Sequence, residues 1–166
     1  RQVFVAFRNG VSSVPSSATF TMPAGTAPVD LVWTLTSEDD VPDLAIVLDD
    51  PNATVVLIHF NTLVAPTALA TDVIAGNAGL GIATSIATAD LNGDFVLDIA
   101  TTRGTGTVEV FLRTGITLTR TSATTIPGAP NPIRIVGAEA NGASVLKLDP
   151  ISDVAVLNTI PNELRL

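Results

Sequence analysis

The segment "DLAIVL" at residues 43–48 has two similar counterparts later in the chain, "DIATT" from Asp98 and "DVAVLN" from Asp153. The three leading aspartates are spaced 55 residues apart. A second acidic residue stands four positions before each of them, at Asp39, Asp94 and Asp149. Two acidic positions that keep the same spacing in three copies indicate an internal repeat of 55 residues.

Each copy of the repeat contains four segments with the composition of short β-strands. A strand pattern precedes the acidic segment: "PVDLVWTL" from Pro28, "IATSIATA" from Ile82 and "PIRIVGAEA" from Pro132. Another follows it: "TVVLIHFN" from Thr54, "TVEVFLRTG" from Thr107 and the shorter "NELRL" from Asn162. A more variable strand opens each unit, at residues 18–22, 68–76 and 117–126. Gly and Pro stand at the joins, and no segment shows a sustained helical period.

Tandem units of four short strands predict an all-β fold made of β-propeller blades, because radial repetition leaves only short, protected strand edges. A sandwich of hairpins is the alternative, but it predicts no strict repeat length. We expect residues 1–166 to form a single propeller segment. Its blades are expected at residues 16–62, 67–115 and 116–166, with residues 1–10 forming the last strand of a preceding blade.

The leading strand is assigned by its match to a later one. "QVFVAFRNG" at residues 2–10 aligns with "TVEVFLRTG" at 107–115, which places Val3 on Val108 and Arg8 on Arg113. Closed propellers typically contain four to eight blades. Three units and a fraction therefore predict that this segment needs neighbours, either the remaining blades of a longer array or a second copy of the chain.

Composition excludes several classes of protein. The chain is 46% hydrophobic and 14% charged, which argues against disorder, and its net charge of −8 disfavours nucleic-acid binding. The absence of cysteine excludes disulfides and thiolate metal sites. The longest apolar stretch is interrupted by Pro66, Asp72 and Asn77, so a membrane-spanning helix is not expected. The chain begins at Arg1 without a signal peptide, which we interpret as a processed product or an excerpt.

The middle copy, "IATADLNGDFVLDIATTRGTGTVEVFL" at residues 86–112, resembles FG-GAP/VCBS-type repeats. These are the propeller repeats of integrin alpha subunits and of many secreted bacterial proteins. The resemblance extends over nearly the whole chain and is weaker in the outer two copies. It implies an extracellular β-propeller with a calcium loop between the second and third strands of a blade, as the blades are divided above.

The loop of the middle copy has side chains suited to calcium, which prefers six to eight oxygen ligands. Asp90, Asn92, Asp94 and Asp98 occupy positions 1, 3, 5 and 9 of the loop. The family resemblance adds the backbone carbonyl of Val96 as a fifth ligand. The loop is not an EF-hand, because Phe95 and Thr101 stand where that motif has Gly and Glu. The alternative is an Asx-rich turn that holds no ion.

The equivalent loops of the outer copies are poorer. The first has Leu35 and Ser37 at positions 1 and 3 and keeps Asp39 and Asp43, which we interpret as turn residues around an empty site. In the third copy, an ungapped alignment places Val145 and Lys147 at those positions. An alignment anchored on the preceding strand instead predicts a distorted second site, made by Glu139, Asn141, Asp149 and Asp153.

Two single residues receive structural interpretations. His59 is the only histidine and lies in a strand pattern, so we expect it at a strand edge or between blades and not in a catalytic site. Trp33 is the only tryptophan, and it is expected in the core. With six Phe and no Tyr, the chain offers few aromatic side chains on which a sugar could stack.

These observations predict a non-enzymatic, calcium-braced propeller segment that acts as a scaffold or a binding and adhesion module. We expect a secreted or cell-surface location. The expected partners are a calcium ion, the neighbouring blades or a second copy, and a protein or glycan ligand. The alternatives are an accessory part of a larger secreted polysaccharide-directed enzyme, or a lectin. Fold alone does not select among them.

Overall fold

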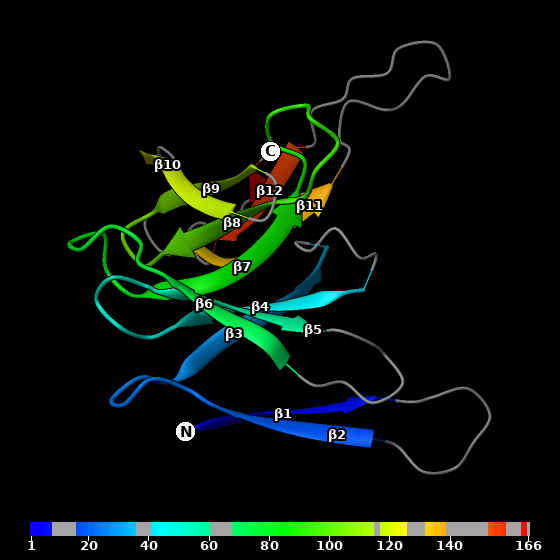
Figure 1. Cartoon of the computed structure of the whole chain (residues 1–166). Helices are drawn as coiled ribbons and strands as arrows, with labels where there is room; N and C mark the ends of the chain where they lie inside the picture. Colours follow the sequence, from blue (N-terminus) through cyan, green and yellow to red (C-terminus); the bar gives the residue numbers. More distant parts are fainter. Residues whose placement is uncertain are drawn as a thin grey trace.

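The structure is a computed structural model, and it describes residues 1–7, 16–35, 41–60, 68–114, 117–125, 132–138, 153–158 and 164–165. These residues form thirteen β-strands in four antiparallel sheets, none of which is closed (Figure 1). The predicted all-β class is therefore confirmed. Within the described ranges, no helix is long and apolar enough to cross a membrane.

The strands follow the chain order within each sheet. The first sheet pairs β1 (Gln2–Phe7) with β2 (Ser16–Thr21). The second contains β3 (Pro28–Thr34), β4 (Asp43–Leu48), β5 (Val55–Phe60) and β6 (Ala68–Ile74). The third contains β7 (Ala83–Ala89), β8 (Asp98–Arg103), β9 (Thr107–Thr114) and β10 (Thr117–Thr125). The fourth contains β11 (Pro132–Ala138), β12 (Asp153–Asn158) and β13 (Leu164–Arg165).

The predicted order of strands within a unit was wrong by one strand. The variable strand that was expected to open each unit instead closes the sheet before it: β6 pairs with β5, and β10 pairs with β9. Only two residues separate β9 from β10, and so short a connection fits a hairpin between them. The sheets therefore span residues 28–74, 83–125 and 132–165.

The leading strand is not the last strand of its sheet either. β1 pairs with β2 along its whole length, from Gln2 opposite Thr21 to Phe7 opposite Ser16. By its match to β9, β1 is the third strand of a sheet, and β2 is then the fourth, equivalent to β10. The first sheet thus contains the equivalents of the last two strands of a unit, not of the last one alone.

The four sheets lie one on another in the order of the sequence, as Figure 1 shows from β1–β2 to β11–β12. Successive side chains of β4 pack against different neighbouring sheets, because side chains alternate between the two faces of a strand. Leu44 and Ile46 pack in a core that includes Val3 and Val5 of β1. Ala45 and Val47 instead pack in a core shared with the β7–β10 sheet. All six residues of β4 are buried as a result.

A third core joins the β7–β10 sheet to the β11–β13 sheet, through Ala87, Ala100, Ile135 and Val156 among others. The first strands of successive sheets also touch, so that β7 contacts both β3 and β11. Asp30 of β3 accepts hydrogen bonds from the Ser85 hydroxyl (2.6 Å) and the Ile86 amide (3.2 Å) of β7. The regular stacking positions the loop after β7 at one end of its sheet.

Candidate metal site

The predicted calcium loop connects β7 to β8 and curls around the carboxylate of Asp90. Asp90 Oδ1 accepts hydrogen bonds from the amides of Gly93 (2.8 Å) and Asp94 (3.2 Å). Asp90 Oδ2 accepts a hydrogen bond from the amide of Phe95 (2.8 Å). Although Asp90 begins the loop, it is only 8% exposed. Its carboxylate therefore organises the backbone of the five residues that follow.

Asn92 and Asp94 lie on the exposed side of the loop and contact each other. The Asn92 Nδ2 group donates to Asp94 Oδ2 (3.1 Å), and Asn92 Oδ1 accepts from the Asp94 amide (2.9 Å). Asp94 Oδ1 accepts from the amide of Val96 (2.9 Å). Each of these side chains closes an Asx turn with the residue two positions later.

Asp98 ties the loop to the rest of the sheet. Its side chain is fully buried, and it accepts hydrogen bonds from the amides of Leu91 (2.9 Å) and Arg113 (2.8 Å). Leu91 belongs to the loop and Arg113 to β9, so one carboxylate connects the two. Asp43, the equivalent residue of the first copy, accepts in the same way from the amide of Phe60 (3.1 Å) in β5.

The backbone bends at two residues with left-handed conformation. Gly93 has φ of 80°, as expected for the glycine that permits the turn. Phe95 has φ of 64°, which is uncommon for a residue with a side chain. Phe95 is 82% exposed, so packing of its side chain does not explain the conformation. The hydrogen bond from the Phe95 amide to Asp90 Oδ2 holds Phe95 in this left-handed conformation.

The three carboxylates of the loop act electrostatically on one another. Burial raises the pKa of Asp98 above its usual value, and the nearby charges of Asp94 and Asp90 act in the same direction. The amide hydrogen bonds from Arg113 and Leu91 oppose this shift of the pKa. Among the described residues, no ion pair joins Asp90, Asp94 or Asp98 to a basic side chain. A cation would relieve this repulsion.

The donor set fits calcium in kind, because it offers three carboxylates and one amide oxygen within nine residues. Its arrangement is less complete. In the described part of the chain, no three acidic, histidine or cysteine side chains are grouped so that they could hold a metal ion. The structure thus brings Asp90, Asn92, Asp94 and Asp98 into one hydrogen-bonded loop, but it does not turn their oxygens toward a common point. Of Val96, only the amide takes part in that network.

The corresponding loop residues of the two outer copies lie mostly outside the described residues. This applies to Ser37 and Asp39 of the first copy and to Glu139, Asn141 and Asp149 of the third. Asp153 begins β12, opposite Ala138. Leu35 is exposed at the end of β3.

His59 has carboxylates on both sides, a feature that the sequence did not indicate. Its Nδ1 lies 3.2 Å from Asp43 Oδ2, and its Nε2 lies 3.2 Å from Asp72 Oδ2. Asp43 is fully buried, whereas the side chain of Asp72 is 55% exposed. Because the carboxylates contact opposite ring nitrogens, the three side chains do not converge on one ion. The 55-residue spacing singles out Asp43 in the sequence. Asp72 lies in β6, whose variable sequence gives no such signal.

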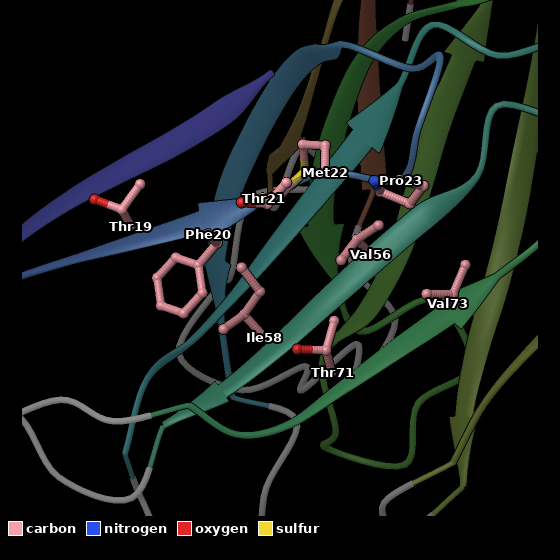
Figure 2. A pocket seen from close by; sticks show the side chains of 9 residues that line it. All are labelled: Thr19, Phe20, Thr21, Met22, Pro23, Val56, Ile58, Thr71 and Val73. Atoms are coloured by element: carbon pink, nitrogen blue, oxygen red, sulfur yellow. The ribbon is translucent and has the colours of Figure 1, made fainter.

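A groove of about 490 Å³ lies between β2 and the pair β5–β6. Figure 2 shows Phe20 and Ile58 from its two sides, with Met22 and Val56 further along. Its polar lining consists of the threonines Thr19, Thr21 and Thr71, and no charged side chain lines it. Ligand sites usually add a few convergent polar groups to an apolar wall. The groove therefore does not compete with the loop as a candidate site.

No protein-family model matches the sequence, and the search of curated proteins finds no significant relative.

Proposed function

We propose that this chain is a non-enzymatic β-propeller segment that binds calcium at the Asp90–Asp98 loop and serves as a scaffold or binding module in an extracellular or cell-surface protein. The observation that carries the proposal is the organisation of the loop by its own side chains. Four residues with side-chain oxygens, spaced as a calcium loop requires, already hold the backbone in a closed turn.

The side chains of Asp90, Asn92, Asp94 and Asp98 would hold the ion, together with the carbonyl of Val96. A bound calcium ion would supply positive charge where three carboxylates lie close together. Asp98 is joined to both the loop and β9. Ion binding would therefore brace the connection between β7 and β8 against the rest of the sheet, and would rigidify the surface that the loop presents.

Thermal unfolding with and without calcium tests this proposal. Addition of chelator should lower the melting temperature and calcium should restore it. At a hundredfold excess over the dissociation constant, linkage predicts about 2.7 kcal/mol of stabilisation. Asp94→Ala should abolish the response, because Asp94 is a ligand in the exposed half of the loop.

Asp39→Ala is the matched control, since Asp39 holds the equivalent position in the first copy and should leave the response intact. Magnesium at the same concentration tests selectivity. If the melting temperature of the wild type is the same in chelator and in calcium, stabilisation by calcium is excluded. A scaffold or binding role without calcium would not be excluded by that result.

The two alternatives predict different ligands. A lectin would bind sugars on a glycan array, and Trp33, 45% exposed on β3, is one aromatic side chain on which a sugar could stack. An accessory part of a polysaccharide-directed enzyme would bind the polysaccharide but leave it intact. Retention on an insoluble polysaccharide column separates this case from a protein-binding scaffold.

A further inference from the structure

Asn92 and Gly93, in the loop between β7 and β8, are two neighbouring residues that can react with each other. An asparagine that precedes glycine loses its side-chain amide without an enzyme when the backbone nitrogen of the glycine attacks the side-chain carbonyl carbon. Glycine has no side chain to obstruct this approach. Asn92 is exposed, and it is the only asparagine among the described residues that glycine follows. The loop therefore contains both groups that spontaneous deamidation requires.

The structure restrains both reacting groups. The Gly93 amide, which supplies the attacking nitrogen, donates to Asp90 Oδ1 at 2.8 Å. This nitrogen must lose its proton before it attacks, and the negative charge that it would then carry is disfavoured beside the Asp90 carboxylate. The Asn92 side chain is held by Asp94, because Oδ1 accepts from the Asp94 amide (2.9 Å) and Nδ2 donates to Asp94 Oδ2 (3.1 Å). In the closed loop, deamidation is thus slowed.

Asp90 is the stronger of the two restraints. It is 8% exposed, and it also accepts from the amides of Asp94 and Phe95, so several hydrogen bonds keep its carboxylate in place. The contacts between Asn92 and Asp94 lie on the exposed side of the loop, where water competes for them. A local opening that separates Gly93 from Asp90 releases the nitrogen, and such an opening costs less free energy than unfolding of the whole protein.

We propose that Asn92 is a site of spontaneous deamidation that the Asp90 carboxylate holds in check. Once the Gly93 nitrogen has lost its proton, it forms a bond to Asn92 Cγ, and the bond from Cγ to the side-chain nitrogen breaks. The side-chain nitrogen leaves as ammonia, and a cyclic imide remains. Water then opens the imide at either carbonyl, which gives aspartate or isoaspartate. The net reaction consumes water and releases ammonia, and it needs neither an oxidant nor a reductant.

Either product changes the charge of the candidate metal loop. A carboxylate replaces the amide, so the loop then carries four carboxylates in place of three. In the aspartate product, the Nδ2 group that donates to Asp94 Oδ2 becomes an oxygen, and two carboxylates face each other. Without a cation this repulsion should destabilise the loop, whereas bound calcium would gain ligand charge. The effect on calcium rests on the proposed function, but the deamidation itself does not.

Peptide mapping by mass spectrometry, after incubation in chelator at mildly alkaline pH, tests the proposal. In the folded wild type, Asn92 should lose its amide at least about tenfold more slowly than in urea, the factor that corresponds to a hydrogen bond with a charged group. Asp90→Ala should remove this protection. Asp90→Asn keeps an oxygen at the same place without the charge, and it should remove the protection in part. Circular dichroism reports whether the variants remain folded, and Asp90→Asn decides the outcome if Asp90→Ala unfolds.

Asp50→Ala is the matched control for the loss of a turn aspartate. Asp50 accepts hydrogen bonds from the amides of Asn52 (2.8 Å) and Thr54 (3.2 Å), but it belongs to the β4–β5 hairpin. This variant should leave the rate at Asn92 unchanged. Equal rates in the folded and the unfolded wild type, an Asp90→Asn variant with the wild-type rate, or an Asp50→Ala variant as fast as Asp90→Ala would each overturn the proposal.

Gly93→Ala tests the chemistry itself, in urea, where the fold plays no part. It should slow the loss of the amide at Asn92 but not at Asn9 or Asn141, which glycine also follows. An unchanged rate at Asn92 would show that the Gly93 nitrogen is not the attacking group.

Asn92→Asp has the charge of the aspartate product and tests the consequence separately. Its melting temperature in chelator should lie below that of the wild type, and calcium should raise it by more than it raises that of the wild type. An unchanged melting temperature in chelator would contradict the predicted repulsion. If calcium stabilises neither protein, the proposed function fails, and the rates at Asn92 remain a separate test of the role of Asp90.

Discussion

The guanidinium of Arg103 and the carboxylate of Glu109 form an ion pair with no solvent exposure. Arg103 Nε donates to Glu109 Oε2 at 3.0 Å. The same guanidinium donates to the carbonyls of Asn52 (2.7 Å) and Gly81 (3.0 Å), and Glu109 Oε1 accepts from the amide of Asn77 (2.7 Å). The pair thus joins the β4–β5 hairpin, the connection between sheets and the β8–β9 hairpin at one buried point.

Loss of one partner from this pair should be costly. Glu109→Ala leaves the Arg103 charge buried without its carboxylate, and removal of one member of a buried pair typically costs about 3–5 kcal/mol. Urea unfolding should show that loss of stability. The control is Arg1→Ala, which removes an exposed ion pair with Asp49 and should cost about 0–1 kcal/mol. Equal losses in the two variants would contradict the importance of burial here.

Gly76 should not tolerate a side chain. A Cβ at this position would overlap Arg103 Nη2 and the Asn52 carbonyl, and would lie 2.6 Å from Glu109 Oε2. Gly76→Ala therefore forces apart the buried ion pair, and overpacking of this kind typically costs about 1–3 kcal/mol. At Gly104 the nearest atom to an added Cβ is 3.8 Å away, so Gly104→Ala should be nearly neutral. Melting temperatures of the two variants provide the comparison, and similar values would refute the predicted overlap.

Substitutions of Asp98 and Asp94 should differ in their effect on stability in the absence of calcium. In chelator, Asp98→Ala should still destabilise the protein, because the amides of Leu91 and Arg113 lose their acceptor; an unsatisfied buried amide costs about 1–3 kcal/mol. Asp94→Ala loses only exposed hydrogen bonds and should stay within about 0.5 kcal/mol of the wild type. Denaturant unfolding in chelator measures both. A large loss for Asp94→Ala would show that its role is structural even without the ion.

Phe95 should be replaceable with a gain in stability. Its left-handed backbone costs about 1–2 kcal/mol for a residue with a Cβ, and its exposed ring contributes little packing. Phe95→Gly removes this strain but adds flexibility to the unfolded chain, so we expect a net gain of up to about 1 kcal/mol. Val96→Gly is the control and should destabilise, because Val96 has no positive φ to relieve. A destabilised Phe95→Gly variant would indicate that the ring makes a contact worth more than the strain.

The 55-residue repeat made the second strand of each sheet predictable. An aspartate followed by a nearly continuous apolar run is typical of a strand buried on both faces. β4 and β8 are indeed buried at every position. The loop was also predictable in part, because Asp90 and Asp98 act locally on amides of the loop that they delimit.

The grouping of strands into sheets was not predictable in the same way. β6 and β10 have mixed polar and apolar sequences, as edge strands do, and nothing in such a sequence shows which neighbour it pairs with. Only the connection between β9 and β10 carries a signal in the chain, because two residues between strands favour a hairpin.

The sequence by itself determined the strand class and, through the 55-residue spacing of Asp43, Asp98 and Asp153, the positions of the second strands, because these depend on local composition and on periodicity. Only the tertiary structure decided the partners of side chains that meet across sheets. It placed His59 between Asp43 and Asp72, and it left Trp33, which was expected in the core, partly exposed beside the ring of Phe60. The burial of those residues depends on which sheet packs against them, and the sequence of a single strand does not show which sheet that will be.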